Sequence, residues 1–165
     1  MAVNPSLAFT IDAAAMRWRP LRENDVPAVA ELEREAHVAP WTPGNFSDAL
    51  AAGYGMVVGE AWGSIVAYGV LLLAPGEAQL LNLTVASHAR RQGIGRALLR
   101  RFLGEARRRG AMQCFLEVRE SNAPAIALYA AEGFVPVARR IAYYPPASSG
   151  EREDALVLRR ALGPG

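Results

Sequence analysis

The stretch RRQGIGR, residues 90–96, stands between an apolar run that ends near Val85 and an amphipathic segment that begins at Ile94. Its two glycines let the backbone turn tightly and approach a ligand without a Cβ atom in the way. Residues 94–109 carry apolar side chains at helical spacing and arginines on the other faces. Free N–H groups in the first turn of such a helix, together with its dipole, attract anions. The stretch therefore predicts a strand, a glycine turn and a helix that can hold a diphosphate.

The sequence of residues 90–96 fits other phosphate-binding loops less well. The chain has no G-x-x-x-x-G-K-[ST] pattern, and the third glycine of a dinucleotide-binding fingerprint is missing. A turn that uses glycine for its geometry alone, beside solvated arginines, accounts for the spacing equally well. The spacing by itself leaves both interpretations open.

Outward from this stretch, the periodicity predicts alternating helices and strands in one domain over 16–161. A loose extension over 1–15 and a short tail over 162–165 are expected at the ends. The order of elements indicates an α/β fold with a mixed sheet covered by helices. Helices are predicted at 25–36, 46–51, 94–109 and 122–132, and strands at 16–21, 54–60, 64–73, 78–85, 112–119, 134–141 and 155–160.

Composition narrows the function classes. The 165 residues are 52% hydrophobic and 21% charged, which is typical of a globular protein. A formal charge of +2 does not indicate a nucleic-acid-binding protein, and no apolar run is long enough to span a membrane. A single cysteine, Cys114, and two histidines give neither an internal disulfide nor a zinc cluster, so we expect no metal and a reducing cytoplasm.

The glycine stretch resembles a known signature. Arg90-x-x-Gly93-x-Gly95, followed by Arg-Ala-Leu-Leu, is similar to the acetyl-CoA motif of the GNAT acyltransferase superfamily. The resemblance implies the GNAT fold, a mixed and mostly antiparallel sheet of about seven strands flanked by about four helices. It also implies acetyl-CoA as cosubstrate, bound through backbone amides of the loop and of the preceding strand. The implied cofactor-binding residues are Leu83, Thr84, Val85, Arg91, Gln92, Gly93, Ile94, Gly95, Arg96 and Asn122.

Further segments resemble the RimI group, the ribosomal-protein-alanine N-acetyltransferases. This resemblance implies transfer of an acetyl group to the N-terminal amino group of a protein. The usual acceptor in that group is the N-terminal alanine of the eighteenth protein of the small ribosomal subunit. The segments are AH at 36–37, PW at 40–41, FLEVRESN at 115–122, AIALY at 125–129, EGF at 132–134, YYP at 143–145 and REDA at 152–155.

Two residues are candidates for the chemistry. Strand alternation places Glu117 on the face opposite Cys114, in an apolar run where a carboxylate is costly to bury without a partner or a task. Burial would raise the pKa of Glu117 towards that of a general base, although a solvent-facing carboxylate at a strand end is the alternative. Tyr129 shares a helical face with Asn122, and a core aromatic is its alternative. The RimI resemblance implies that Glu117 is the general base and Tyr129 the general acid.

The acceptor side is indicated by aromatic residues. The RimI resemblance places Trp41, Tyr143 and Tyr144 at the peptide entrance, whereas aromatic plugs at the ends of the sheet are an equal alternative. Glu35 and His37 are further candidates for assisting the acceptor amine. The chain departs from the RimI pattern at Arg139-Arg140, at Ala142 and in a longer turn over 146–151, all beside this entrance.

Three other functions remain open at this point. A GNAT enzyme can acetylate lysine side chains or a small-molecule amine, and a related domain can bind acetyl-CoA without catalysis. The arginines between Arg100 and Arg109 could contact ribosomal RNA, although a solvated helix face accounts for them.

Overall fold

A computed structural model describes residues 10–164. It contains one seven-stranded sheet in the order β1-β2-β3-β4-β5-β7-β6, in which β4 and β5 are parallel and every other neighbouring pair is antiparallel. Four α-helices accompany it, so the predicted sheet and helices are confirmed. The strands are β1 (Arg17–Pro20), β2 (Gly55–Ala61), β3 (Ser64–Ala74), β4 (Glu77–Val85), β5 (Gln113–Arg119), β6 (Val135–Tyr144) and β7 (Glu153–Ala161); the helices are α1 (Val26–Ala36), α2 (Pro43–Ala51), α3 (Ile94–Arg108) and α4 (Ala123–Ala131).

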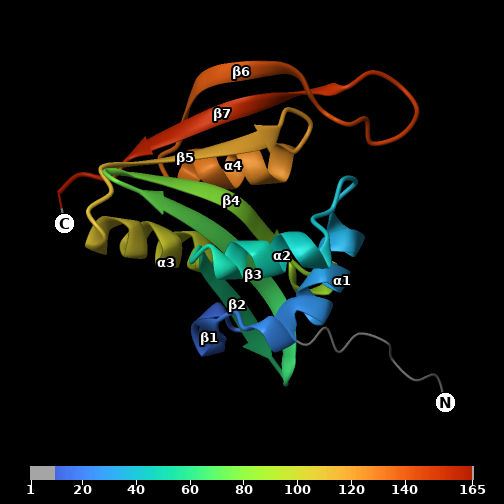
Figure 1. Ribbon diagram of the computed structural model, residues 1–165, viewed down its shortest axis with the longest axis vertical. Coiled ribbons are helices and arrows are strands. Elements are labelled where there is room, and N and C mark those ends of the chain that lie inside the picture. Colours follow the sequence, from blue (N-terminus) through green and yellow to red (C-terminus); the bar gives the residue numbers. More distant parts are fainter. Residues whose placement is uncertain (1–9, 165) are drawn as a thin grey trace.

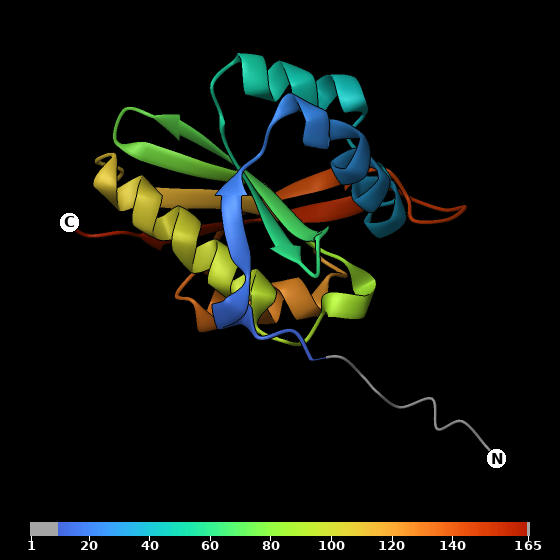
Figure 2. The same ribbon diagram turned by 90° about the horizontal axis from the view of Figure 1, so that it is seen from below.

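The helices cover the two faces of the sheet in pairs. Helices α1 and α2 lie on one face, and α3 and α4 lie on the other (Figures 1 and 2). Phe102 of α3 packs directly on Gly69 of β3, where a Cβ atom would stand 2.4 Å from the ring. Phe46 of α2 meets the Tyr68 ring of β3 edge-on from the opposite face, with ring centroids 5.6 Å apart. The sheet is thus buried on both sides at its centre.

Helix α2 begins earlier than the sequence pattern predicts. It starts at Pro43 rather than Phe46, because Thr42 caps it: the Thr42 hydroxyl accepts from the Asn45 amide at 3.2 Å, and the Asn45 side chain accepts from the Thr42 amide at 2.9 Å. A proline in the first turn of a helix has no N–H to satisfy. The loop between α1 and α2 therefore ends at residue 42.

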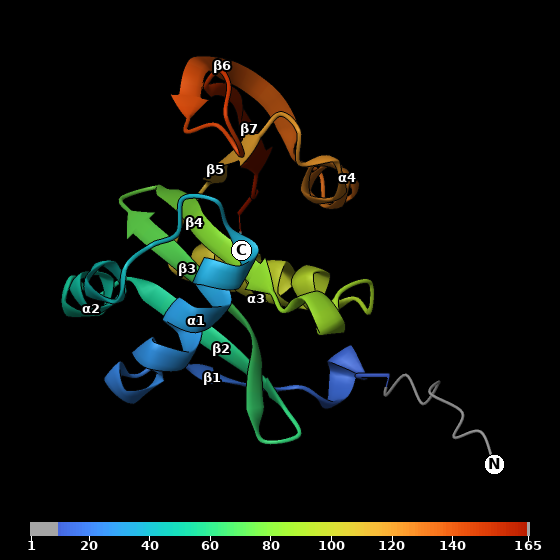
Figure 3. The ribbon, with the colours of Figure 1, turned by 90° about the vertical axis from the view of Figure 1, so that its right-hand side faces the viewer.

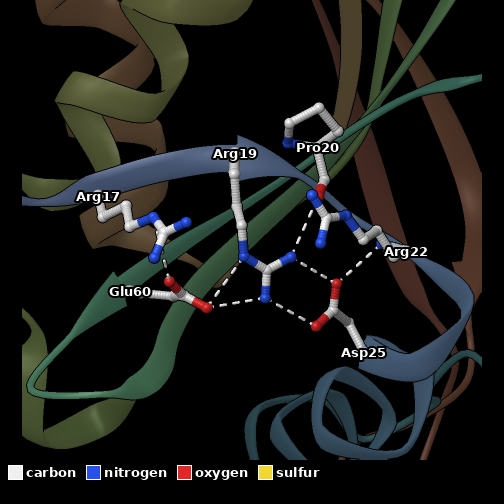
Figure 4. Close-up of polar contacts among 6 residues, drawn as sticks. All are labelled: Arg17, Arg19, Pro20, Arg22, Asp25 and Glu60. Carbon is white, nitrogen blue, oxygen red and sulfur yellow. Dashed lines mark hydrogen bonds and ion pairs between the residues drawn. The ribbon is translucent and has the colours of Figure 1, made fainter.

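Strand β1 is fixed to the domain by an ion-pair network (Figure 4). The Arg19 guanidinium lies 2.7 Å from Asp25, just before α1, and 2.7 Å from Glu60 on β2. Asp25 also accepts from the backbone amide of Arg22 at 2.8 Å. These contacts hold the pKa of Asp25 below its usual range, the Arg19 hydrogen bond being the main cause. Arg19 therefore links the first strand, the second strand and the start of α1.

The two ends of the chain are described in part. Residues 1–9, most of the predicted N-terminal extension, and Gly165 lie outside the described residues. Ile11 is buried with Val66 and Ile94, and its backbone amide donates to the side-chain oxygen of Gln92. At the other end, Leu162 is buried and its amide donates to the Met112 carbonyl at 2.9 Å.

Candidate active site

The site begins where two parallel strands separate. Strands β4 and β5 pair from Glu77–Gln113 only as far as Leu80–Leu116, although both continue beyond that point. A bulge at the same place, where β3 residues Val70 and Leu71 face Asn82 and Leu80, inserts Leu81 as an extra residue in β4. A β-bulge bends its strand, so β4 turns away from β5 here. Figure 3 shows the two strands with α1 and α4 on opposite sides of them.

The separated strands form the walls of a cleft of about 210 Å³. One wall comes from β4, the end of α1 and the loop after it, and it includes Glu33, His37 and Trp41. The other wall comes from β5, α4 and the end of β6, and it includes the predicted residues Glu117, Asn122, Tyr129 and Tyr144. Side chains from positions 33 to 144 of the chain therefore meet in one place.

The N-terminus of α3 has the free amides that the glycine stretch predicts. Gly93 is its N-cap and adopts the left-handed conformation, with φ +79°. No side chain caps this end, whereas Thr42 caps α2 and Asn122 caps α4. The first-turn N–H groups are consequently available to an external anion. Gly95 plays a different part, because a Cβ atom there would meet its nearest neighbours at an ordinary 3.6 Å.

The side chains around this turn divide into two groups. Arg91 is exposed beside Gly93, whereas Ile94 is buried, so the latter could offer a ligand only its backbone. The Gln92 side chain accepts from Ile11, and Arg96 pairs with Glu132 at 3.1 Å. The uncapped amides and Arg91 fit a diphosphate, while the Gln92 and Arg96 side chains are engaged within the protein.

Glu117 lies on the predicted face of β5, but it has an unpredicted partner. Cys114, Leu116 and Val118 form the buried face of the strand, and the Glu117 side chain on the other face is 17% exposed. The Arg140 Nε atom lies 2.7 Å from Glu117 Oε1. The Tyr143 hydroxyl also bonds to this carboxylate, which raises the pKa of Tyr143. The carboxylate is thus stabilised by a cation and a hydrogen bond, instead of standing alone in an apolar site.

Strand β6 is irregular directly after Arg140. Arg140 pairs with Ala155 and Tyr144 pairs with Glu153, so two extra residues bulge out of β6 between them. Ala142 in this bulge has φ +50°, and its amide donates to Asp154 at 2.8 Å. Of the positions at which the chain departs from the RimI pattern, Ala142 lies in this bulge and Arg140, the partner of Glu117, lies directly before it.

Tyr129 is both a core residue and a cleft residue. It is 8% exposed, and its ring meets that of Phe134 edge-on with centroids 5.8 Å apart. Burial raises the pKa of Tyr129 to about 12, so the phenol keeps its proton well above neutral pH. Asn122 similarly has two roles: its side chain caps α4 by accepting from the Ala125 amide at 3.2 Å, and the residue also lines the cleft.

The aromatic candidates come from two segments that are far apart in the sequence, the loop before α2 and the end of β6. Trp41 and Tyr144 line it, and Tyr143 lies beside Tyr144 with ring centroids 5.0 Å apart. The Arg119 guanidinium stands 4.5 Å from the Tyr144 ring centroid. Burial raises the pKa of Tyr144 to about 12.

The sequence pattern did not assign a role to Glu33. This residue is 2% exposed, accepts from the Trp41 amide and from the Asn82 side chain at 3.0 Å each, and also accepts from the Tyr68 hydroxyl. Its sequence signal is a carboxylate on the apolar stripe of α1, where an unpaired charge would be costly. Glu35, the residue considered instead, is exposed and does not line the cleft.

Several arginines at the surface of α3 and its C-terminal end form ion pairs with nearby carboxylates. Arg108 and Arg109 pair with Glu105 at 2.6 and 2.9 Å, and Arg100 pairs with Glu132 at 3.0 Å. Among residues 10–164, no group of three or more His, Cys, Asp or Glu side chains is placed to hold a metal ion. No helix in the same range is long and apolar enough to cross a membrane.

Comparison with known proteins decides the family. The model of the acetyltransferase (GNAT) family matches residues 26–134. The chain belongs to the GNAT family. This GNAT chain is 37% identical over 138 residues to the [ribosomal protein bS18]-alanine N-acetyltransferase of Escherichia coli K12, with 84% of this chain and 92% of that protein covered.

A second relative and a solved structure agree with this assignment. The N-alpha-acetyltransferase RimI of Mycobacterium tuberculosis is 35% identical over 162 residues, covering 94% of this GNAT chain and 98% of the relative. The crystal structure of the ribosomal-protein-S18-alanine N-acetyltransferase from Escherichia coli superposes with a TM-score of 0.84 at 34% identity, over 91% of this chain and 96% of that one. The resemblance to the GNAT superfamily and its RimI group is thus confirmed.

Proposed function

We propose that this protein transfers the acetyl group of acetyl-CoA to the N-terminal amino group of a protein, with the N-terminal alanine of ribosomal protein bS18 as its acceptor. The observation that carries the proposal is the cleft between β4 and β5, which joins Glu117 and Tyr129 to an aromatic entrance. The likeness to two N-terminal acetyltransferases over most of the chain supports the same acceptor. A ribosomal acceptor also fits an enzyme of the cytoplasm.

The binding of acetyl-CoA is assigned to backbone more than to side chains. The uncapped amides at the start of α3, with Gly93 in the left-handed conformation and Arg91 beside it, would hold the diphosphate. Leu83, Thr84 and Val85 lie on the part of β4 that no longer pairs with β5, so their backbone would run beside the acetyl-bearing arm. One amide there would stabilise the negative charge that develops on the carbonyl oxygen. Bound acetyl-CoA supplies an acetyl group activated as a thioester.

The reacting side chains come from the opposite wall. Glu117 would accept a proton from the attacking nitrogen, directly or through water, and Arg140 at 2.7 Å would hold the carboxylate in position. Tyr129, whose pKa of about 12 keeps it protonated, would donate its proton to the departing sulfur. Trp41, Tyr143 and Tyr144 would flank the incoming peptide.

The test is incubation with acetyl-CoA and short peptides that differ at residue one, each with an internal lysine, followed by mass spectrometry. We expect acetylation of the terminal amine, with alanine preferred, and at least a tenfold loss of turnover in Glu117→Gln with coenzyme A affinity nearly kept. Acetylation confined to lysines would contradict the acceptor. Binding of coenzyme A without any acetylation would indicate a non-catalytic module, and no heat of binding in calorimetry would refute the cofactor site itself.

A further inference from the structure

A partly buried chain of hydrogen bonds lies on the β4 wall of the cleft. It runs from Glu33 through Asn82 and Thr84 to His37. Glu33 and Thr84 are 2% and 3% exposed, whereas 40% of the His37 side chain is exposed, and His37 lines the cleft. The chain of bonds therefore leads from the protein interior to the place where the acceptor amine is expected.

The direction of every bond in this chain is fixed by its buried end. The Glu33 carboxylate only accepts, so the Asn82 Nδ2 group donates to it at 3.0 Å. The Asn82 Oδ1 atom then faces Thr84 and only accepts, so the Thr84 hydroxyl donates to it at 2.8 Å. With its single proton used, Thr84 Oγ1 can only accept from His37 Nε2, which lies 2.8 Å away.

This sequence of bonds selects one tautomer of the His37 ring. The proton of neutral His37 must be on Nε2, where the Glu33 carboxylate at 3.5 Å also favours it. The lone pair is then on Nδ1, the nitrogen that the chain of bonds leaves free to accept. A general base that is oriented by a further hydrogen-bonded group is a common arrangement in catalytic sites.

The reaction needs two proton acceptors. At pH 7 about nine-tenths of α-amino groups are ammonium, because their pKa is about 8. The balanced reaction converts R–NH3⁺ and the thioester into R–NH–CO–CH3, the thiol and one proton. The nitrogen therefore loses one proton before it attacks and another as the N–C bond forms and the C–S bond breaks. Tyr129 gives one proton to sulfur, and one proton in total leaves for solvent.

We propose that His37 is the residue that takes the first proton, from the ammonium group of the acceptor, and that Glu33, Asn82 and Thr84 are positioning residues that keep its Nδ1 unprotonated. Glu117, on the facing wall, takes the second. This inference rests on the proposed N-terminal acetylation. The charged or titratable groups that face the cleft around His37 are Glu33 from α1, Glu117 and Arg119 from β5, Tyr129 from α4 and Tyr144 from β6, with Tyr68 of β3 behind Glu33.

The first test compares His37→Gln with wild type from pH 6.5 to 9, using a peptide with N-terminal alanine. Without the base only free amine reacts, and the free fraction rises from about one-tenth at pH 7 to about nine-tenths at pH 9. The loss in kcat/KM should therefore shrink about tenfold between these pH values, with unchanged coenzyme A affinity. His88→Gln, at the exposed second histidine, is the matched control and should behave as wild type. A loss that is equal at every pH, or no loss, overturns the proposal.

The second test reads the tautomer without catalysis. In the ¹⁵N-labelled His88→Gln protein, His37 is the one remaining histidine, so its ring nitrogens are assigned directly. We expect the proton on Nε2 in this protein, and a mixture of tautomers when Thr84→Val is added. A proton on Nδ1 contradicts the bond sequence. Because this readout needs no acceptor, a failure to acetylate N-terminal peptides would refute the proposed function and leave the tautomer result to be judged separately.

Discussion

Replacing Tyr129 by phenylalanine removes one oxygen atom from the cleft and leaves the aromatic ring in place. The ring is 8% exposed and meets Phe134 edge-on at 5.8 Å, and both features are kept by phenylalanine. The variant should therefore fold as wild type, with a change in the free energy of unfolding below about 1 kcal/mol at neutral pH. Any large effect on turnover is then due to the hydroxyl group.

The environment of the phenol sets its protonation state. Burial raises the pKa of Tyr129 from 10.0 to about 12, so the proton is held about 3 kcal/mol more firmly than in water. Such a phenol stays protonated across the working pH range, so its hydroxyl is available to donate to the departing sulfur while negative charge develops there. A positioned general acid contributes about 10²- to 10⁴-fold, so turnover should fall at least tenfold in Tyr129→Phe.

The assay is single-turnover transfer at saturating acetyl-CoA, with coenzyme A affinity measured by calorimetry. We expect a lower rate of chemistry, nearly unchanged affinity, and no decline of the wild-type rate from ionisation of Tyr129 below about pH 11. Since the folded-state pKa lies above the unfolded value, the associated stability is complete below pH 10 and is lost as the pH rises towards 12. Tyr129→Phe should lose less stability across that window. A variant with turnover within twofold of wild type would refute the general-acid role.

The remaining predictions concern backbone conformation. Gly93→Ala places a side chain at φ +79°, so it should cost about 1–2 kcal/mol of stability and weaken coenzyme A binding in calorimetry. Gly95→Ala lies inside α3 with its nearest neighbours at 3.6 Å, so it should keep the affinity and raise the melting temperature; equal effects of the two variants would contradict this assignment. Ala142→Asn should relieve the left-handed residue in β6 and stabilise the protein by about 0.5–1 kcal/mol in denaturant unfolding, and a lower midpoint would show that φ +50° is not strained there.

The faces on which the candidate residues lie could largely be predicted, because the signals for them are local in the sequence. Alternation along 112–119 placed Glu117 opposite Cys114, and helical spacing placed Asn122 and Tyr129 on one face; the cleft indeed contains all but Cys114. The glycine stretch predicted the free helix terminus, since a left-handed residue before a helix is most easily glycine. The start of α2 was predicted too late, because a proline such as Pro43 is typical both of a loop and of the first turn of a helix.

The partners of the reacting groups had no such signal. No local signal indicated a charge partner for Glu117, which Arg140 of β6 reaches across the intervening strand β7. His37 bonds to Thr84, 47 residues away, and Asn82 bonds to Glu33, 49 residues away. Local periodicity and turn chemistry therefore determined which face each candidate occupies. The separation of β4 from β5 and the pairing of side chains across the cleft depend on packing between residues that are far apart in the chain. Such packing cannot be predicted from a short stretch of sequence.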